Sequence, residues 1–487
     1  MLAPRALGRW IAVAGAALTF AYTVVLIADF DTGARGLQYV TDETWIAELG
    51  IHYKLGVDGL NLMLVGLTGL LFLASFVWLA LTDWERPGQM VFFFGLAESS
   101  VLGALLAQDL ALFVLFFDLM LVPFFFLTGI WGPPATRIAA ITKLFIYTLV
   151  GSLLMLTAAI ALGVLSAQQG GGDLTFVLSD LARVRLSEGT QQWIFLCFAA
   201  AFLVKMPAFP LHGWMPDGYR NMPLPVLAVF SGVLSKVAAY GFLRVVTPLL
   251  PDASVHFQEL MMLLALASIL YGSAMAFTTT DVRLVLGYSS VAQLGFIVLG
   301  IFSLQGDGAQ GAIFQAVNHG LVVAPAFVVV AALALRAGGS EDVRDMGGLA
   351  FRAPVLAAMF LIVTLATLAM PGSANFVGEF LILFGAFNSK IAIAIVAFTG
   401  VALASVYALR LFIRSMHNRV GADAVSRELT LREGVVLVPL VAVVLFFAVY
   451  PQLALDRSER AATQSVRVAG ALAHPEETRI AQEQPTP

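Results

Sequence analysis

Residues 202–217 read FLVKMPAFPLHGWMPD, a segment in which an apolar run ends at a lysine and continues through three prolines. A proline removes a backbone donor and clashes with the preceding helical turn, so it breaks a helix. Unwound backbone at membrane depth is tolerated only inside protein or beside a watery cavity. The segment therefore predicts a broken membrane helix with Lys205 at the break, a pattern that marks transport sites.

The composition of the whole chain is that of a membrane protein. Of 487 residues, 60% are hydrophobic and 12% are charged, whereas soluble domains have about 45–50% and about 25%. This excludes a soluble, disordered or nucleic-acid-binding chain, and the net charge of −4 gives no sign of a polyanionic partner. The single cysteine, Cys197, excludes a disulfide framework and a cysteine-ligated cluster. Because only helices and closed barrels satisfy their backbone in lipid, an all-α polytopic membrane protein is predicted.

Thirteen apolar stretches approach the roughly 17–25 residues that a membrane helix needs. They lie near 10–28, 57–81, 89–107, 109–131, 139–165, 191–210, 222–247, 258–277, 283–303, 309–335, 354–386, 390–413 and 433–453. The stretch at 354–386 is predicted to be interrupted. The first stretch is predicted to be retained as a span, because it is longer than the apolar core of a signal peptide.

The basic residues predict the orientation of these spans, since cytoplasmic loops carry the excess of lysine and arginine. With the N-terminus inside, the inner side holds Arg5, Arg9, Arg86, Arg137, Lys143, Arg220, Arg283, Arg336, Arg344, Arg352, Arg414, Arg419, Arg427 and Arg432. The outer loops hold Arg35, Lys54, Arg183, Arg185 and Lys390. The prediction is a cytoplasmic N-terminus and a C-terminus outside.

A second segment repeats the interruption. Residues 370–380 read MPGSANFVGEF, with Pro371 and Gly372 ahead of Glu379. Broken helices in corresponding places suggest internal repeats. Five spans make up each unit, and an odd number requires the second copy to be inverted. The predicted organisation is N-terminal helices and an outer loop (1–88), a first five-helix repeat (89–247), a second (258–413), a C-terminal helix (433–453) and a polar flexible tail (454–487).

Five ionisable residues stand inside predicted spans, where a charge costs about 2.5–3.5 kcal/mol and marks a functional site by default. They are Asp118, Lys205, Lys236, His319 and Glu379, with Glu98 as a weaker sixth. An apolar environment favours a neutral lysine and a nearby carboxylate favours a charged one. Movement of Asp118 relative to Lys205 would therefore switch that lysine between holding and releasing a proton. The structural alternative is a buried acid–base pair that pins two helices together.

The sequence resembles the antiporter-like M subunits of bacterial respiratory complex I, the proton-pumping NADH:quinone oxidoreductase. The resemblance rests on motifs spread over nearly the whole chain. These are LGVDGL at 55–60, FDLMLVPFFFLTGIWG at 117–132, the segment at 202–217, GVLSKVAAYGFLR at 232–244, NHGL at 318–321 and the segment at 370–380.

The resemblance implies a role for each of the five residues. It implies that Asp118 pairs with Lys205, and that Lys236 connects two half-channels. His319 then continues the path and Glu379 lies near the outward exit. Related L and N subunits typically have lysine where this chain has Glu379, which favours an M subunit. The short chain beyond the last span would not supply the lateral helix of an L subunit.

Three departures from the family pattern carry predictions of their own. The pairing acid is usually glutamate, so the shorter Asp118 predicts a changed distance to Lys205 or an intervening water. A family histidine is replaced by Gln293, in YSSVAQLG, and glutamine hydrogen-bonds but does not titrate. The family has fourteen helices with both ends outside, so thirteen spans predict a start at the family's second helix.

The predicted function is a proton-translocating membrane-arm subunit of NADH:quinone oxidoreductase in the bacterial cytoplasmic membrane. No cofactor is expected in this chain, since FMN, iron–sulfur clusters and quinone belong to partner subunits in the family. L- and N-type subunits and lipid are the expected neighbours, and no nucleic acid. The alternatives are a subunit of a multi-subunit cation/proton antiporter, a hydrogenase-type membrane arm, and a structural spacer without a working channel.

Overall fold

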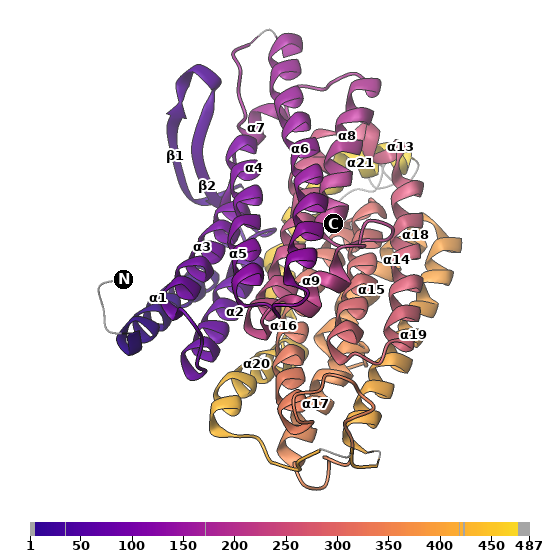
Figure 1. The fold of residues 1–487 in the computed structure, drawn as a ribbon. Coiled ribbons are helices and arrows are strands. Elements are labelled where there is room, and N and C mark those ends of the chain that lie inside the picture. The colour runs from indigo at the N-terminus through magenta and orange to yellow at the C-terminus, as the bar shows by residue number, and fades with distance from the viewer. Residues whose placement is uncertain (1–4, 35, 171, 418, 422–423, 476–487) are drawn as a thin grey trace.

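The N-terminal part of the chain leads into a helical bundle (Figure 1). The computed structural model describes residues 5–34, 36–170, 172–417, 419–421 and 424–475. Helix α1 (Arg5–Asp29) is followed by strand β1 (Gln38–Ile46), the short 3-10 helix η1 (Ala47–Leu49), strand β2 (Ile51–Val57) and helix α2 (Leu62–Leu81). The two strands form an antiparallel hairpin that projects beside the bundle, with Gln38 paired to Val57 and Thr44 to His52.

The first predicted repeat contains two interrupted helical stretches. Its elements are α3 (Pro87–Leu106), α4 (Leu110–Leu119), α5 (Leu121–Trp131), α6 (Arg137–Gly170), α7 (Leu178–Leu181), α8 (Glu188–Lys205), α9 (Met215–Asn221) and a continuous helical run over Leu224–Leu249. That run comprises α10 (Leu224–Val229), the π-helical turn η2 (Phe230–Leu234), α11 (Ser235–Gly241), the π-helical turn η3 (Phe242–Val246) and α12 (Thr247–Leu249). Asp109 separates α3 from α4, because its side chain accepts a hydrogen bond from the Leu112 amide and caps α4.

The second predicted repeat follows after a short helix. Its elements are α13 (Pro251–His256), α14 (Gln258–Thr278), α15 (Val282–Phe302), α16 (Gly306–Arg336), α17 (Pro354–Thr367), α18 (Ala374–Ser389) and α19 (Ile391–Met416). The chain then forms α20 (Leu431–Val449) and α21 (Gln452–Ala473). Both predicted interruptions are confirmed as helix ends, at Lys205 and at Thr367.

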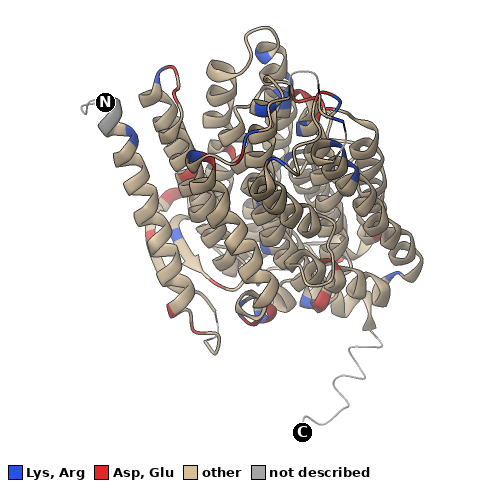
Figure 2. Cartoon of the chain, turned by 90° about the horizontal axis from the view of Figure 1, so that it is seen from below, with Lys and Arg blue, Asp and Glu red and all other residues tan. Residues whose placement is uncertain are grey.

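Eleven helical stretches of the described chain are long and apolar enough to span a membrane by length and composition. The predicted spans at 191–210 and 354–386 are missing from that set. Helix α8 ends at Lys205 inside the first of these stretches, and α9 begins only at Met215. The second stretch is divided into α17 and α18. Charged residues gather mainly on loops and helix ends, and the middle of the bundle is largely free of them (Figure 2).

Three helical stretches form the centre of the bundle. Every residue of α15 is buried, as are nearly all residues of α16 and of the run at 224–249. A helix that is apolar all round belongs in an interior. The predicted residues Lys236 and His319 lie on these central helices, so the fold holds them away from lipid.

The prediction of a flexible tail from residue 454 is wrong for residues 454–473, which form most of α21. Polar composition suggested a solvated segment, but small and apolar side chains recur on one face of this helix. Ala454, Ala462, Val466 and Ala469 are buried there. Arg457 donates from Nε to the Ile27 carbonyl at 3.1 Å, and α21 also packs on α13 and α16. Residues 476–487 of the predicted tail lie outside the described residues.

Candidate functional site

The first break places a buried lysine at a helix end. Lys205 is the last residue of α8 and is 7% exposed. Its ammonium donates to the Phe117 carbonyl at 3.2 Å and lies 4.5 Å from the centre of the Phe117 ring. Carbonyl groups freed by the break find new donors, since Trp214 Nε1 donates to the Val204 carbonyl at 2.9 Å. The unwound segment is therefore stabilised from within the protein.

Asp118 lies beside this lysine without touching it. The carboxylate is half-buried near the end of α4, and it interacts electrostatically with Lys205 and lies beside Ser152 of α6. Among the ion pairs of the described residues, none joins the two side chains within 4.0 Å. Lys205 bonds instead to the carbonyl of the residue before Asp118. Whether the shorter acid changes this spacing, compared with a glutamate, stays a prediction.

Lys236 follows directly on the π-helical turn η2. The side chain is fully buried, and its ammonium donates to the Ser231 carbonyl, which belongs to that turn. A π-helical turn leaves backbone carbonyls without their usual helical donors, and such turns occur frequently at functional sites. The turn thus supplies the acceptor that a buried ammonium requires.

His319 of α16 lies within electrostatic reach of Lys236. It is 4% exposed, and its Nδ1 has no hydrogen-bond partner within the described part of the chain. The next residue is Gly320, where an added Cβ would lie 2.5 Å from the Gly232 carbonyl oxygen of η2. The two backbones can approach this closely only because Gly320 has no side chain.

Glu379 ends a chain of hydrogen-bonded amides. It lies on α18 just beyond the second break and is 2% exposed. Gln293 of α15 donates from Nε2 to Glu379 Oε1 at 2.8 Å, and Gln315 of α16 donates from Nε2 to Gln293 Oε1 at 2.8 Å. Gln293 is thus the central link of this hydrogen-bonded chain.

Helix α16 joins the two groups of residues. Gln315 and His319 are four residues apart, so they lie one above the other on the same face of that helix. His319 lies within electrostatic reach of Lys236, and one turn away Gln315 bonds to Gln293, which bonds to Glu379. The structure thereby places Lys236 near His319, and two amides link Glu379 to the same helix. No hydrogen bond joins Lys205 to Lys236 among the described residues, although α8 packs against α11.

Further polar side chains lie on the helices that carry this hydrogen-bonded chain, and the sequence analysis did not select most of them. Atoms without a protein partner among the described residues include Gln315 Oε1, Asn318 Oδ1, both polar side-chain atoms of Asn375, and Glu379 Oε2. A buried polar group without a partner costs about 1–3 kcal/mol, and ordered water commonly satisfies such groups. Their sequence signal was available, because Gln315 and Asn318 are amides within an apolar span and Gln315 shares a helix face with His319. Glu98, the weaker candidate, is also buried with Oε1 unpartnered.

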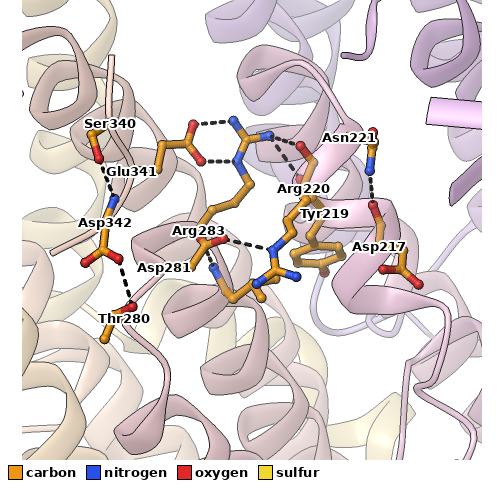
Figure 3. A network of polar contacts seen from close by, with 11 residues as sticks. Asp217, Tyr219, Arg220, Asn221, Thr280, Asp281, Arg283, Ser340, Glu341 and Asp342 are labelled. Carbon is orange, nitrogen blue, oxygen red and sulfur yellow. Dashed lines mark hydrogen bonds and ion pairs between the residues drawn. The ribbon is translucent and has the colours of Figure 1, made fainter. Parts of the chain in front are cut away.

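An arginine network fastens the first break to the second repeat (Figure 3). Arg283, near the start of α15, donates from Nη1 to the carbonyls of Tyr219 at 3.0 Å and Met222 at 2.6 Å, at the end of α9. Its Nε donates to Glu341 at 2.8 Å, and Arg220 pairs with Asp281 at 3.0 Å. Close by, hydrogen bonding from Arg344 lowers the pKa of Asp342 to about 2, which keeps that carboxylate charged.

The fold and the buried charges define a polytopic, antiporter-like membrane protein. The chain belongs to the NADH:quinone oxidoreductase/Mrp antiporter transmembrane family, whose profile matches residues 107–404. Similar proteins include NADH-quinone oxidoreductase subunit M of Rhodobacter capsulatus, 36% identical over 92% of this chain and 88% of the relative. Subunit M of Escherichia coli strain K12 is 38% identical over 93% and 91%. The predicted resemblance to M subunits is confirmed.

Solved structures share the fold. A chain of respiratory complex I from Thermus thermophilus with bound NADH matches with a TM-score of 0.87 and 30% identity over 96% of both chains. A chain of the Mrp complex from Dietzia sp. matches with a TM-score of 0.80 and 21% identity, over 96% of this chain and 95% of the other. The second similarity concerns the fold alone. Within the described residues, no group of three or more His, Cys, Asp or Glu side chains could hold a metal ion.

Proposed function

We propose that this chain translocates protons as the M-type membrane-arm subunit of NADH:quinone oxidoreductase. The observation that carries the proposal is the buried succession from Lys236 through His319, Gln315 and Gln293 to Glu379. These groups exchange or relay protons, and they lie between two broken helices in a chain related to subunits M.

The first half-channel uses Asp118 and Lys205. The ammonium of Lys205 is stabilised by a carbonyl and an aromatic face, with Asp118 near but out of contact. Approach of the carboxylate favours the charged lysine, and withdrawal favours release of its proton toward Lys236. His319 then passes the proton to Glu379 through water held along the two amides. Gln293 and Gln315 cannot titrate, so they act by holding water and the Glu379 carboxylate in place.

The number of helices and the position of the breaks support thirteen crossings in two inverted five-helix repeats. Counting α8 with α9 and α17 with α18 as one broken crossing each adds two crossings to the eleven apolar helices, and the break then falls on the fourth member of both repeats. Arg9 in α1 donates to the Thr82 carbonyl at the end of α2, while Arg457 of α21 donates to Ile27 at the other end of α1. The start of α1 and α21 therefore lie at opposite ends of the bundle, which supports an N-terminus and an α21 on opposite sides of the membrane. The excess of arginine and lysine in the loops on the N-terminal side then favours a cytoplasmic N-terminus.

The energy for this transport comes from partner subunits in the proposal. This chain is proposed to hold no redox centre, with FMN, iron–sulfur clusters and quinone in other subunits and L- and N-type subunits as neighbours. Moving one charge against the membrane potential costs about 2.3 kcal/mol per 100 mV, which redox chemistry elsewhere must supply. A subunit of a cation/proton antiporter is the second candidate, favoured by the shared fold of the Mrp chain.

NADH-driven acidification of inverted membrane vesicles tests the proposal, with NADH oxidation followed in parallel. Lys205→Ala is expected to abolish proton pumping by this subunit while the complex still assembles. Lys390→Ala is the matched control, because Lys390 is exposed between α18 and α19. A normal ratio of protons to electrons in the Lys205 variant would overturn the proton path. Deletion of this chain gives a second test. If NADH oxidation and acidification stayed unchanged while sodium-dependent proton exchange was lost, the antiporter function would replace the proposed one.

A further inference from the structure

A groove opens at one end of the bundle, away from the proton path. It has a volume of about 500 Å³ and lies between the end of α2, the end of α16 and the start of α20. Its walls are mainly apolar, with Trp78 from α2 and Val436 from α20. Leu335 of α16 and Val425, which precedes α20, line it with exposed fractions of 74% and 62%. Large exposed apolar surface beside membrane helices faces lipid rather than water.

The charges in this groove do not balance. Both acids that line it are already paired with other arginines. Asp83 is held by Arg9 at 3.3 Å, and Glu433 by the buried Arg336 at 2.8 Å.

Two further arginines line the groove and have exposed side chains. These are Arg427 and Arg432. Neither guanidinium makes a hydrogen bond or ion pair with any described residue. The groove therefore combines apolar walls with two unneutralised cations.

We propose that this groove binds an anionic phospholipid, with its phosphate between Arg427 and Arg432 and its acyl chains along α2, α16 and α20. Guanidinium groups bind phosphate oxygens in a bidentate manner. Basic pockets between membrane helices recognise anionic headgroups, and tryptophan is enriched at the same depth. A soluble anion would leave the apolar walls uncovered, and a zwitterionic lipid would leave the excess positive charge unneutralised.

The bound lipid would stabilise the packing of α20 and α2 on α16, the helix that carries His319. The inference depends only on the membrane location of the chain and is independent of the proposed proton path. Its failure would leave the pumping proposal untouched.

Photocrosslinking within the assembled complex tests the site. Leu335 is replaced by the photoreactive amino acid p-benzoylphenylalanine, and the complex is reconstituted in vesicles of phosphatidylglycerol and phosphatidylcholine in equal amounts. Mass spectrometry then measures which lipid is attached at position 335. Each arginine near a surface favours an anionic lipid by roughly five-fold, so the two together predict an excess of phosphatidylglycerol adducts of roughly 25-fold.

Paired variants separate the groove from general charge effects. Arg427→Gln with Arg432→Gln is expected to return the adduct ratio to that of the bulk lipid. Arg352→Gln with Arg419→Gln removes two other exposed arginines, and it is expected to leave the ratio unchanged. Equal labelling by both lipids in the unmodified groove, or attachment to a neighbouring subunit in place of lipid, would overturn the proposal.

Discussion

At the scale of single residues, the lack of a direct contact between Asp118 and Lys205 matters for the proposed proton path. The two charges interact, but no contact within 4.0 Å holds them together among the described residues. A direct buried ion pair would resist separation, because breaking it leaves an uncompensated charge. In the proposed mechanism, the lack of a direct contact lets the lysine respond to small movements of the carboxylate.

Substitution of Asp118 tests whether charge or packing matters at this position. Asp118→Asn is expected to lower proton pumping by about ten-fold or more, since positioned proton-transfer groups typically contribute at least that much. Asp118→Glu keeps the charge and reaches further, so it is expected to keep pumping. The measurement is acidification per NADH oxidised in inverted vesicles. Equal loss in both variants would indicate that the residue serves packing.

Gln293 tests the role of the amide chain. Gln293→Leu removes the donor to Glu379 and the acceptor for Gln315, so it is expected to destabilise the fold by about 1–3 kcal/mol and to lower pumping. Gln258→Leu is the control. Gln258 is also buried, but it donates to the Phe302 and Ser303 carbonyls and takes no part in the hydrogen bonds between Gln315, Gln293 and Glu379. It should cost similar thermal stability without loss of pumping. Equal pumping in the two variants would contradict the assignment.

At the scale of elements, the close approach of α16 to η2 positions His319 opposite Lys236. Gly320→Ala would place a Cβ 2.5 Å from the Gly232 carbonyl oxygen and force the two elements apart. Overpacking of this kind typically costs about 1–3 kcal/mol. We expect a lower unfolding temperature of the subunit in the complex and reduced pumping. Gly189→Ala near the start of α8 meets no atom within 4 Å, and it should be neutral or slightly stabilising in the same two measurements.

At the scale of the whole molecule, Arg283 couples the two predicted repeats. It binds carbonyls at the end of α9 and a carboxylate beyond α16 while standing on α15, the helix of Gln293 (Figure 3). Removal of this guanidinium would leave Glu341 and the carbonyls of Tyr219 and Met222 without their donor. The first broken helix would then lose a link to the helix that carries the amide chain.

Arg283→Gln is expected to increase hydrogen exchange in residues 206–222 and to lower pumping. Breaking a buried, hydrogen-bonded pair typically costs about 3–5 kcal/mol. Arg344→Gln is the control, because its exposed pair with Asp342 contributes about 0–1 kcal/mol and does not touch α9. Unchanged exchange at the break in the Arg283 variant would show that the network does not hold α9.

The sequence by itself determined which segments are apolar helices, where Pro207 and Pro371 accompany their breaks, and which titratable residues are buried. These features are local, because hydropathy and backbone geometry act over a few residues. Only the tertiary structure decided that Asp118 stands apart from Lys205, that Gln315 and Gln293 extend to Glu379, and that α21 packs as a helix. Those outcomes depend on which side chains of distant segments meet. Packing in three dimensions sets such contacts, and spacing along the chain does not encode them.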